Sequence, residues 1–195
     1  LLLLDEPLGA LDAKVREVLR LELRKLVKDL GLTAIHVTHD QEEAMAISDR
    51  MIVMRGGEIV ENASPRDLYL KPKRIFTAYF LGETNLLIGE VAGEVSNKSI
   101  IKIGSNKLRV RSKVNFKTRK VIAAIRPEFI TITKRPKKKR ENRWLCKVKS
   151  VTFTGSTIRY EVQTVDGVPI LVKAASTDEE IETRVGEEVH IEFSS

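Results

Sequence analysis

The sequence begins with four consecutive leucines, Leu1–Leu4, and two adjacent carboxylates, Asp5 and Glu6, follow them directly. A short, continuous apolar run is typical of a β-strand that is buried on both faces, as in parallel sheets. Charged side chains are costly where such a strand emerges, unless water or a metal ion meets them. The pair therefore indicates a site that binds a metal or activates water. The alternative is a solvated strand end that turns at Pro7.

A strand–helix–strand pattern follows. Asp12 occupies an N-cap position, and Gly31 ends a helix whose apolar residues recur at helical spacing. These apolar residues are Val15, Val18, Leu19, Leu23, Leu26, Val27 and Leu30. The β-branched run 33–38 predicts a second strand. Because the connections are short, the three segments predict a βαβ unit with parallel strands.

Polar side chains follow both predicted strands. In an open parallel sheet, ligands bind at the carboxyl ends of the strands. Asp5 and Glu6 lie at one such end and His39 follows the other, so we expect the fold to bring them together. In nucleotide hydrolases a first acid of this kind holds Mg²⁺, and a second orients or deprotonates the attacking water. Taken singly, His39 is more typical of an ordinary loop histidine, and Asp12 of a plain helix cap.

The chain changes from mixed to all-β character near Thr84. Before that point we predict a helix with acidic residues in its first turn, a hairpin at Gly56-Gly57, and two short helices. After it, nine short strands are predicted, at 87–95, 99–103, 107–110, 121–125, 129–132, 145–153, 157–164, 169–173 and 188–193. Residues 1–84 are therefore expected to be α/β, and residues 85–195 an all-β domain of one small barrel or paired barrels.

The net charge of +7 is concentrated in one segment. Residues 134–143 hold seven Lys or Arg and one Glu, a net of +6, which leaves +1 for the rest of the chain. Proteins that bind single-stranded nucleic acid combine such charge with aromatic stacking platforms, and only Trp144 lies near this segment. We interpret it as a solvated loop and expect no nucleic-acid partner; contact with anionic lipid is an alternative. The single cysteine, Cys146, excludes an internal disulfide and fits a reducing cytoplasm.

Three short motifs resemble those of the ATP-binding cassette (ABC) transporter ATPases. LLLLDEP at 1–7 is similar to their Walker B strand, LGALD at 8–12 to their D-loop, and HVTHD at 36–40 to their switch-histidine loop. The resemblance implies that residues 1–84 are the C-terminal part of an ABC ATPase domain. On this interpretation they form a partial parallel sheet of the P-loop type.

The resemblance also implies roles for single residues. Asp5 would coordinate Mg²⁺, through water, and Glu6 would be the catalytic base for the hydrolytic water. His39 would act with it by contacting the γ-phosphate of ATP. Asp12 would communicate with the opposing nucleotide site across a homodimer. The cofactors implied for the complete subunit are therefore ATP and Mg²⁺.

Further segments resemble the importer group whose ATPase domain is followed by a regulatory domain of oligonucleotide/oligosaccharide-binding-like (OB-like) barrels, the TOBE domain. These segments are 40–44, 54–59, 65–69, 80–85 and 125–128. The resemblance implies membrane-spanning permease subunits and a solute-binding protein as partners, at the cytoplasmic face of the cell membrane. FLGETNLL at 80–87 and the segments 153–157 and 168–173 resemble spermidine/putrescine importers more than sugar importers, so we expect polyamine import. Iron, sulfate and thiamine importers share much of this pattern and are the alternatives.

Two motifs of that family do not occur in the sequence. It contains neither a GxxxxGK[ST] phosphate loop nor an LSGGQ signature, and the phosphate loop supplies the N–H groups and the Lys that hold the phosphates. We therefore expect a truncated chain that neither binds nor hydrolyses ATP by itself. The open edge of the strand at 34–38 predicts dimerisation or segment exchange through the α/β part. The alternative function is a regulatory, dimerisation, anion-binding or nucleic-acid-binding OB-like module without ATPase activity.

Overall fold

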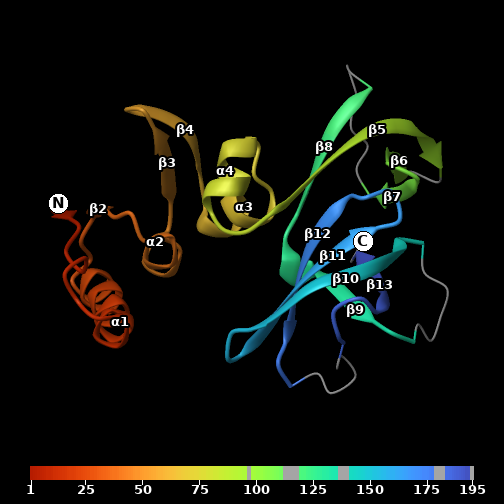
Figure 1. Ribbon diagram of the computed structural model, residues 1–195. Coiled ribbons are helices and arrows are strands. Elements are labelled where there is room, and N and C mark those ends of the chain that lie inside the picture. The colour runs from red at the N-terminus through yellow and green to blue at the C-terminus, as the bar shows by residue number, and fades with distance from the viewer. Residues whose placement is uncertain (96–97, 112–118, 136–140, 178–182, 194–195) are drawn as a thin grey trace. The chain divides into compact units, whose positions relative to one another are not determined.

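The structure, a computed structural model (Figure 1), describes residues 1–95, 98–111, 119–135, 141–177 and 183–193. The chain divides into two units, Leu1–Gly82 and Glu83–Ser195. The centre of the basic segment, residues 136–140, lies outside the described residues. Its interpretation as a solvated loop therefore stays a prediction.

The first unit begins with a βαβ arrangement. Strand β1 (Leu2–Asp5) leads through a loop into helix α1 (Ala13–Asp29), and strand β2 (Ala34–Val37) follows. The two strands pair in parallel, as the strand–helix–strand pattern predicts, with Leu2 opposite Ala34 and Asp5 opposite Val37. Among the described residues they form a sheet of two strands, so the far edge of β2 carries no strand partner there. That these strands are a partial sheet of the P-loop type stays an expectation.

The prediction that β1 is buried on both faces is wrong for the described part of the chain. Leu2 and Leu4 are half-buried, whereas Leu3 is 68% exposed. On β2 the same alternation leaves Ile35 and Val37 exposed. Because successive side chains of a strand point to opposite faces, one face of this small sheet exposes the apolar side chains of Leu3, Ile35 and Val37. Faces of this kind mark surfaces that another segment or another chain covers.

Helix α1 begins and ends where the sequence predicts. The Oδ1 atom of Asp12 accepts hydrogen bonds from the N–H groups of Lys14 and Val15, at 3.1 and 3.0 Å. These bonds satisfy donors that the first turn of a helix leaves without a partner. At the other end, Gly31 has a φ of 61° and donates its N–H to the carbonyl of Lys28 at 3.0 Å. A left-handed residue that returns a hydrogen bond to the last turn is a common helix end.

The rest of the first unit is built from short elements: α2 (Gln41–Ile47), β3 (Met51–Arg55), β4 (Glu58–Ala63), α3 (Pro65–Leu70) and α4 (Ile75–Phe80). β3 and β4 form the predicted antiparallel hairpin around Gly56 and Gly57, which both have positive φ, as the tight turn between paired strands favours. The buried residues Met51, Val53, Leu68 and Leu81 form a small core.

The second unit consists of two antiparallel sheets (Figure 1). One has the order β7-β6-β5-β8, from β5 (Asn85–Val95), β6 (Lys98–Ile103), β7 (Asn106–Val110) and β8 (Lys120–Ile125). The other has the order β12-β11-β10-β13-β9, from β9 (Ile130–Thr133), β10 (Arg143–Phe153), β11 (Thr157–Thr164), β12 (Pro169–Ala175) and β13 (Glu188–Phe193). Phe129 was expected in a strand, but it belongs to a 3₁₀ turn at Pro127–Phe129, because proline fixes φ and has no N–H to give to a sheet.

The larger sheet curls into a nearly closed barrel, since its two outer strands, β12 and β9, come into contact. The all-β character predicted for this part of the chain is confirmed. Its core is formed by alternate side chains of both sheets, among them Leu87, Ile103, Trp144, Tyr160 and Ile191. Inward alternation of this kind is what a barrel with a filled interior requires.

Two asparagine side chains connect the sheets by mimicking a strand backbone. The side chain of Asn85 accepts a hydrogen bond from the N–H of Leu171 at 2.7 Å and donates to its carbonyl at 2.8 Å. Asn142 does the same with Arg109, with both bonds at 2.8 Å. Both amides are buried, so these bonds satisfy polar groups that would otherwise be costly to bury.

Cys146 is buried in the core of the second unit. Burial disfavours its thiolate form, and the nearby Asp166 carboxylate adds to the effect, so that the pKa of Cys146 is raised to about 12. None of the helices in the described ranges is both long and apolar enough to span a membrane.

Candidate active site

Two loops meet at the carboxyl ends of β1 and β2, and they carry the predicted site residues Glu6 and His39. The Oε1 atom of Glu6 lies 2.9 Å from Nδ1 of His39, which is hydrogen-bonding distance. The two side chains are 52% and 74% exposed, so both are accessible from solvent. The parallel pairing of β1 and β2 thus brings together two residues that are 33 positions apart in the sequence.

The first loop has an unusual backbone at Glu6. This residue has a φ of 45°, in the left-handed region that non-glycine residues adopt at a cost and that often occurs at functional sites. The conformation is held by hydrogen bonds from the Glu6 N–H to the Val37 carbonyl at 2.9 Å and from the Gly9 N–H to the Glu6 carbonyl at 3.1 Å. The loop therefore presents the Glu6 carboxylate directly beside the end of β2.

Asp5 and Asp12 lie on either side of Glu6 in the sequence but have different surroundings. Asp5 ends β1 and is exposed, and within the described residues its carboxylate has no hydrogen bond or ion pair. The Asp12 carboxylate caps helix α1, as described above. Asp12 is therefore a helix cap here, and a second role across a dimer stays a prediction.

The second loop, Thr38–Asp40, is anchored by Glu43, which is only 2% exposed. Its carboxylate accepts a hydrogen bond from the Thr38 hydroxyl at 3.1 Å and lies 2.5 Å from Nε2 of His36. The Glu43 N–H in turn donates to Oδ1 of Asp40 at 3.0 Å. The sequence predicts Glu43 only as one of the acidic residues in the first turn of this helix. The spacing Asp40-x-x-Glu43 is a capping-box pattern, and this signal indicates a side chain that reaches back toward the helix start.

The contact with Glu6 raises the pKa of His39 above its ordinary value, first through the hydrogen bond and then through the negative charge. A raised folded-state pKa means that the pairing contributes stability below the unfolded-state pKa, and that this contribution is lost as the pH rises through the folded-state pKa. We expect an NMR titration to show a raised pKa for His39 that falls toward the ordinary value in Glu6→Gln. Glu42→Gln, which removes an exposed carboxylate two residues beyond Asp40, is the matched control and should leave the His39 pKa unchanged. An equal His39 pKa in Glu6→Gln and Glu42→Gln would contradict the contact with Glu6 as the cause of the raised value.

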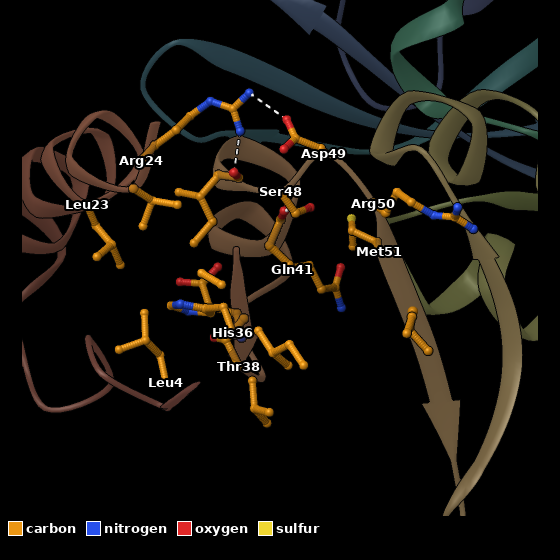
Figure 2. Close-up of a pocket in the computed structure, with 18 of the residues that line it drawn as sticks. Leu4, Leu23, Arg24, His36, Thr38, Gln41, Ser48, Asp49, Arg50 and Met51 are labelled. Atoms are coloured by element: carbon orange, nitrogen blue, oxygen red, sulfur yellow. Dashed lines mark hydrogen bonds and ion pairs between the residues drawn. The ribbon is translucent and has the colours of Figure 1, made fainter. Parts of the chain in front are cut away.

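A cavity of about 700 Å³ lies between β2, β3 and helix α1. Figure 2 shows Leu4, Leu23, His36, Thr38 and Met51 around it. Most of its lining is apolar, and neither Asp5 nor Glu6 contributes to it. The cavity is thus separate from the carboxylates of the candidate site, although His39 borders both.

The exposed ends of β1 and β2 offer hard oxygen donors from Asp5 and Glu6. Mg²⁺ prefers such oxygens and commonly keeps several waters while it binds one or two carboxylates. No group of three or more His, Cys, Asp or Glu gathers into a metal cage among the residues that the structure describes. The carboxylates fit a Mg²⁺ held mainly by water and by other oxygen ligands.

The comparisons with known proteins agree on one family. The TOBE domain family matches residues 123–195. An Fe(3+) ions import ATP-binding protein of Agrobacterium fabrum is 40% identical over 88% of this chain and 47% of its own length. A spermidine/putrescine import ATP-binding protein of Trichodesmium erythraeum is 37% identical over 91% of this chain and 49% of its own length. One of Rubrobacter xylanophilus is 36% identical over 100% of this chain and 52% of its own length.

The chain therefore spans about half the length of the curated relatives it matches. Among solved structures, a molybdate-bound cytoplasmic molybdate-binding protein aligns with 56% of this chain and 89% of that chain, at 13% identity and a TM-score of 0.47, too low to establish a shared fold. The relatives and the TOBE match together confirm the resemblance drawn from the motifs. The chain belongs to the ATP-binding proteins of ABC importers and represents their C-terminal part, with its TOBE domain.

Proposed function

We propose that this chain is part of the ATP-hydrolysing subunit of an ABC import system and carries the water-activating half of its nucleotide site. The observation that supports the proposal best is the Glu6–His39 contact of 2.9 Å at the ends of two parallel strands. Glu6 would accept a proton from the attacking water or orient it, and His39 would contact the γ-phosphate of ATP. Bound Mg²⁺, held through Asp5 and water, would supply charge stabilisation for the phosphates. Asp12 would act toward the opposing site of a homodimer.

The phosphate-binding half of the site would come from other residues of the complete subunit. The sequence contains no GxxxxGK[ST] loop, which in P-loop enzymes holds the phosphates through backbone N–H groups and a Lys. We therefore expect no ATP turnover from the residues of this sequence alone. The proposed activity belongs to the complete subunit.

The proposed partners are a second copy of the subunit, permease subunits in the membrane and a solute-binding protein, with the chain at the cytoplasmic face of the membrane. Support comes from the relatives, which are named as import ATP-binding proteins. The exposed apolar face of β1 and β2 also fits a subunit that is covered on this side. A separate nucleic-acid-binding module, the alternative drawn from the basic segment, is not favoured, because the relatives over most of the chain are ATP-binding proteins.

We propose a polyamine as the transported solute. A relative named for spermidine and putrescine aligns with the whole of this chain. Fe³⁺ is the second candidate, because a relative named for Fe(3+) import has the higher identity, 40% against 36%. The ATP-hydrolysing subunit does not hold the solute, so its sequence indicates the solute through kinship alone.

Uptake measurements would test the function and separate the two solutes. We expect deletion of the gene to reduce uptake of labelled spermidine, and a plasmid copy of the whole gene to restore it. The same copy with Glu6→Gln should fail to restore uptake, although the protein is present at the same level. Loss of ⁵⁵Fe uptake with normal spermidine uptake would make Fe³⁺ the solute, and normal uptake of both would contradict both solute assignments.

A further inference from the structure

Arg16, in the second turn of helix α1, connects the two loops of the candidate site. Its Nη2 atom donates a hydrogen bond to the backbone carbonyl of Leu11 at 2.8 Å, in the loop that follows Glu6. Its Nη1 atom donates to Oδ2 of Asp40 at 3.2 Å, directly after His39. The Arg16 side chain is largely buried. A single guanidinium therefore contacts both loops at once, through the fork of donors that arginine provides.

Asp40 is a fixed point for this contact. Its carboxylate caps helix α2 through the N–H of Glu43, and Arg20 lies 3.5 Å away on its other side. Its backbone N–H donates to the Thr38 hydroxyl at 3.0 Å. Although burial acts in the opposite direction, the Glu43 N–H, the Arg16 guanidinium and the Arg20 charge hold the pKa of Asp40 below its ordinary value. Asp40 is thus ionised at neutral pH and remains available to Arg16.

We propose that Arg16 is a positioning residue that holds the 6–12 loop and the 38–40 loop in register, and so keeps Glu6 and His39 in contact. The expected effect of Arg16 on turnover rests on the proposed ATPase function. Its expected effect on the Glu6–His39 contact is independent of that function. Both side chains of that contact are exposed, so the surrounding packing of those side chains does little to fix their separation. The shared arginine connects the backbone carbonyl of Leu11 in one loop with the Asp40 carboxylate in the other.

Arg24 provides a matched control on the same helix. Eight residues further along α1, it contacts the carbonyl of Ile47. It also contacts the Asp49 carboxylate beyond the end of α2, as Figure 2 shows. It therefore also links α1 to the α2 region, but away from both loops. Removal of either side chain costs contacts made by helix α1, but of these two arginines only Arg16 contacts the site loops.

The first test is steady-state ATP turnover of the complete protein that the gene encodes. We expect Arg16→Ala to lower kcat about tenfold or more with little change in KM, because misplaced catalytic groups are costly even when binding is kept. Arg16→Lys should remain defective, since a lysine ammonium is a single point donor that cannot reproduce the fork. Arg24→Ala should stay within about twofold of the unchanged protein. Equal losses in Arg16→Ala and Arg24→Ala, or full activity in Arg16→Ala and Arg16→Lys, would overturn the inference.

The second test does not need ATP. In an NMR titration of the same proteins, the His39 pKa should be raised in the unchanged protein and in Arg24→Ala, and lower in Arg16→Ala. The direction of the pKa change in Arg16→Ala is informative. The Arg16 charge itself lowers the His39 pKa, whereas Glu6 and Asp40 raise it. Loss of the charge alone would thus raise the pKa, and a fall reports separation of His39 from Glu6. If the unchanged protein lacks ATP turnover, the proposed function fails and this titration still decides the role of Arg16: an unchanged or higher His39 pKa overturns it.

Discussion

ATP turnover by the complete subunit is expected to fall by a factor of about 10²–10⁴ when Glu6 is replaced by glutamine, the range that a general base contributes. Glutamine has nearly the same shape, and its side-chain oxygen can still accept a hydrogen bond from His39. It cannot accept the proton of the attacking water. The change therefore removes the proposed chemistry and keeps the local geometry. Phosphate release under saturating ATP and Mg²⁺ measures the effect.

Two further measurements make the Glu6→Gln result specific. ATP affinity should be unchanged or higher, because the substitution removes a negative charge beside the proposed phosphate site. Glu42→Gln makes the same chemical change at an exposed position close to His39 in the sequence and should keep at least about half of the activity. Turnover in Glu6→Gln that matches Glu42→Gln would exclude Glu6 as the catalytic base.

Substitution of Trp144 by alanine is expected to destabilise the second unit by about 3–5 kcal/mol, as large aromatic truncations in cores do. Trp144 is 2% exposed. Its ring packs edge-on against the ring of Phe193, with 4.6 Å between the ring centroids. Its Nε1 atom donates a hydrogen bond to the Lys107 carbonyl at 3.0 Å. The side chain thus joins β10 of one sheet to β7 of the other. Urea unfolding followed by circular dichroism, which does not depend on the single tryptophan, measures the loss.

Two control variants separate packing from a general effect of losing an aromatic ring. Trp144→Phe keeps a ring in the core but leaves the Lys107 carbonyl without its donor, so we expect an intermediate loss, with about 1–3 kcal/mol from the unpaired carbonyl. Phe153 is 70% exposed at the end of β10, and Phe153→Ala should change stability by less than about 0.5 kcal/mol. A loss from Phe153→Ala as large as that from Trp144→Ala would show that burial does not govern these effects.

Local patterns were sufficient to predict most elements. The cap at Asp12, the left-handed end at Gly31 and the turn at Gly56-Gly57 act within a few residues. Each of them fixes an element boundary without reference to distant parts of the chain. The strands of the second unit followed from short β-branched runs between turn residues. Their order in the sheet, with β13 between β10 and β9, depends on long-range contacts and could not be predicted in this way.

The candidate site was partly predictable for a topological reason. Parallel strands end at the same edge, so Glu6 and His39 could be expected to meet. Only Glu43 has the capping-box spacing from Asp40, but that spacing does not identify its partners His36 and Thr38, which come from β2 and the loop after it. The Arg16–Asp40 pair, 24 residues apart, likewise depends on how α1 meets α2. No periodicity or spacing rule predicts such pairs.

Cys146 has a practical consequence for experiments on this protein. Thiol reagents react with the thiolate, and a buried group whose pKa is raised to about 12 supplies almost none of it at neutral pH. The sequence contains no other cysteine. Within the residues of this sequence, a cysteine introduced on an exposed turn would therefore carry the only reactive thiol. Fluorophores or spin labels attached there would leave the core thiol of Cys146 unmodified.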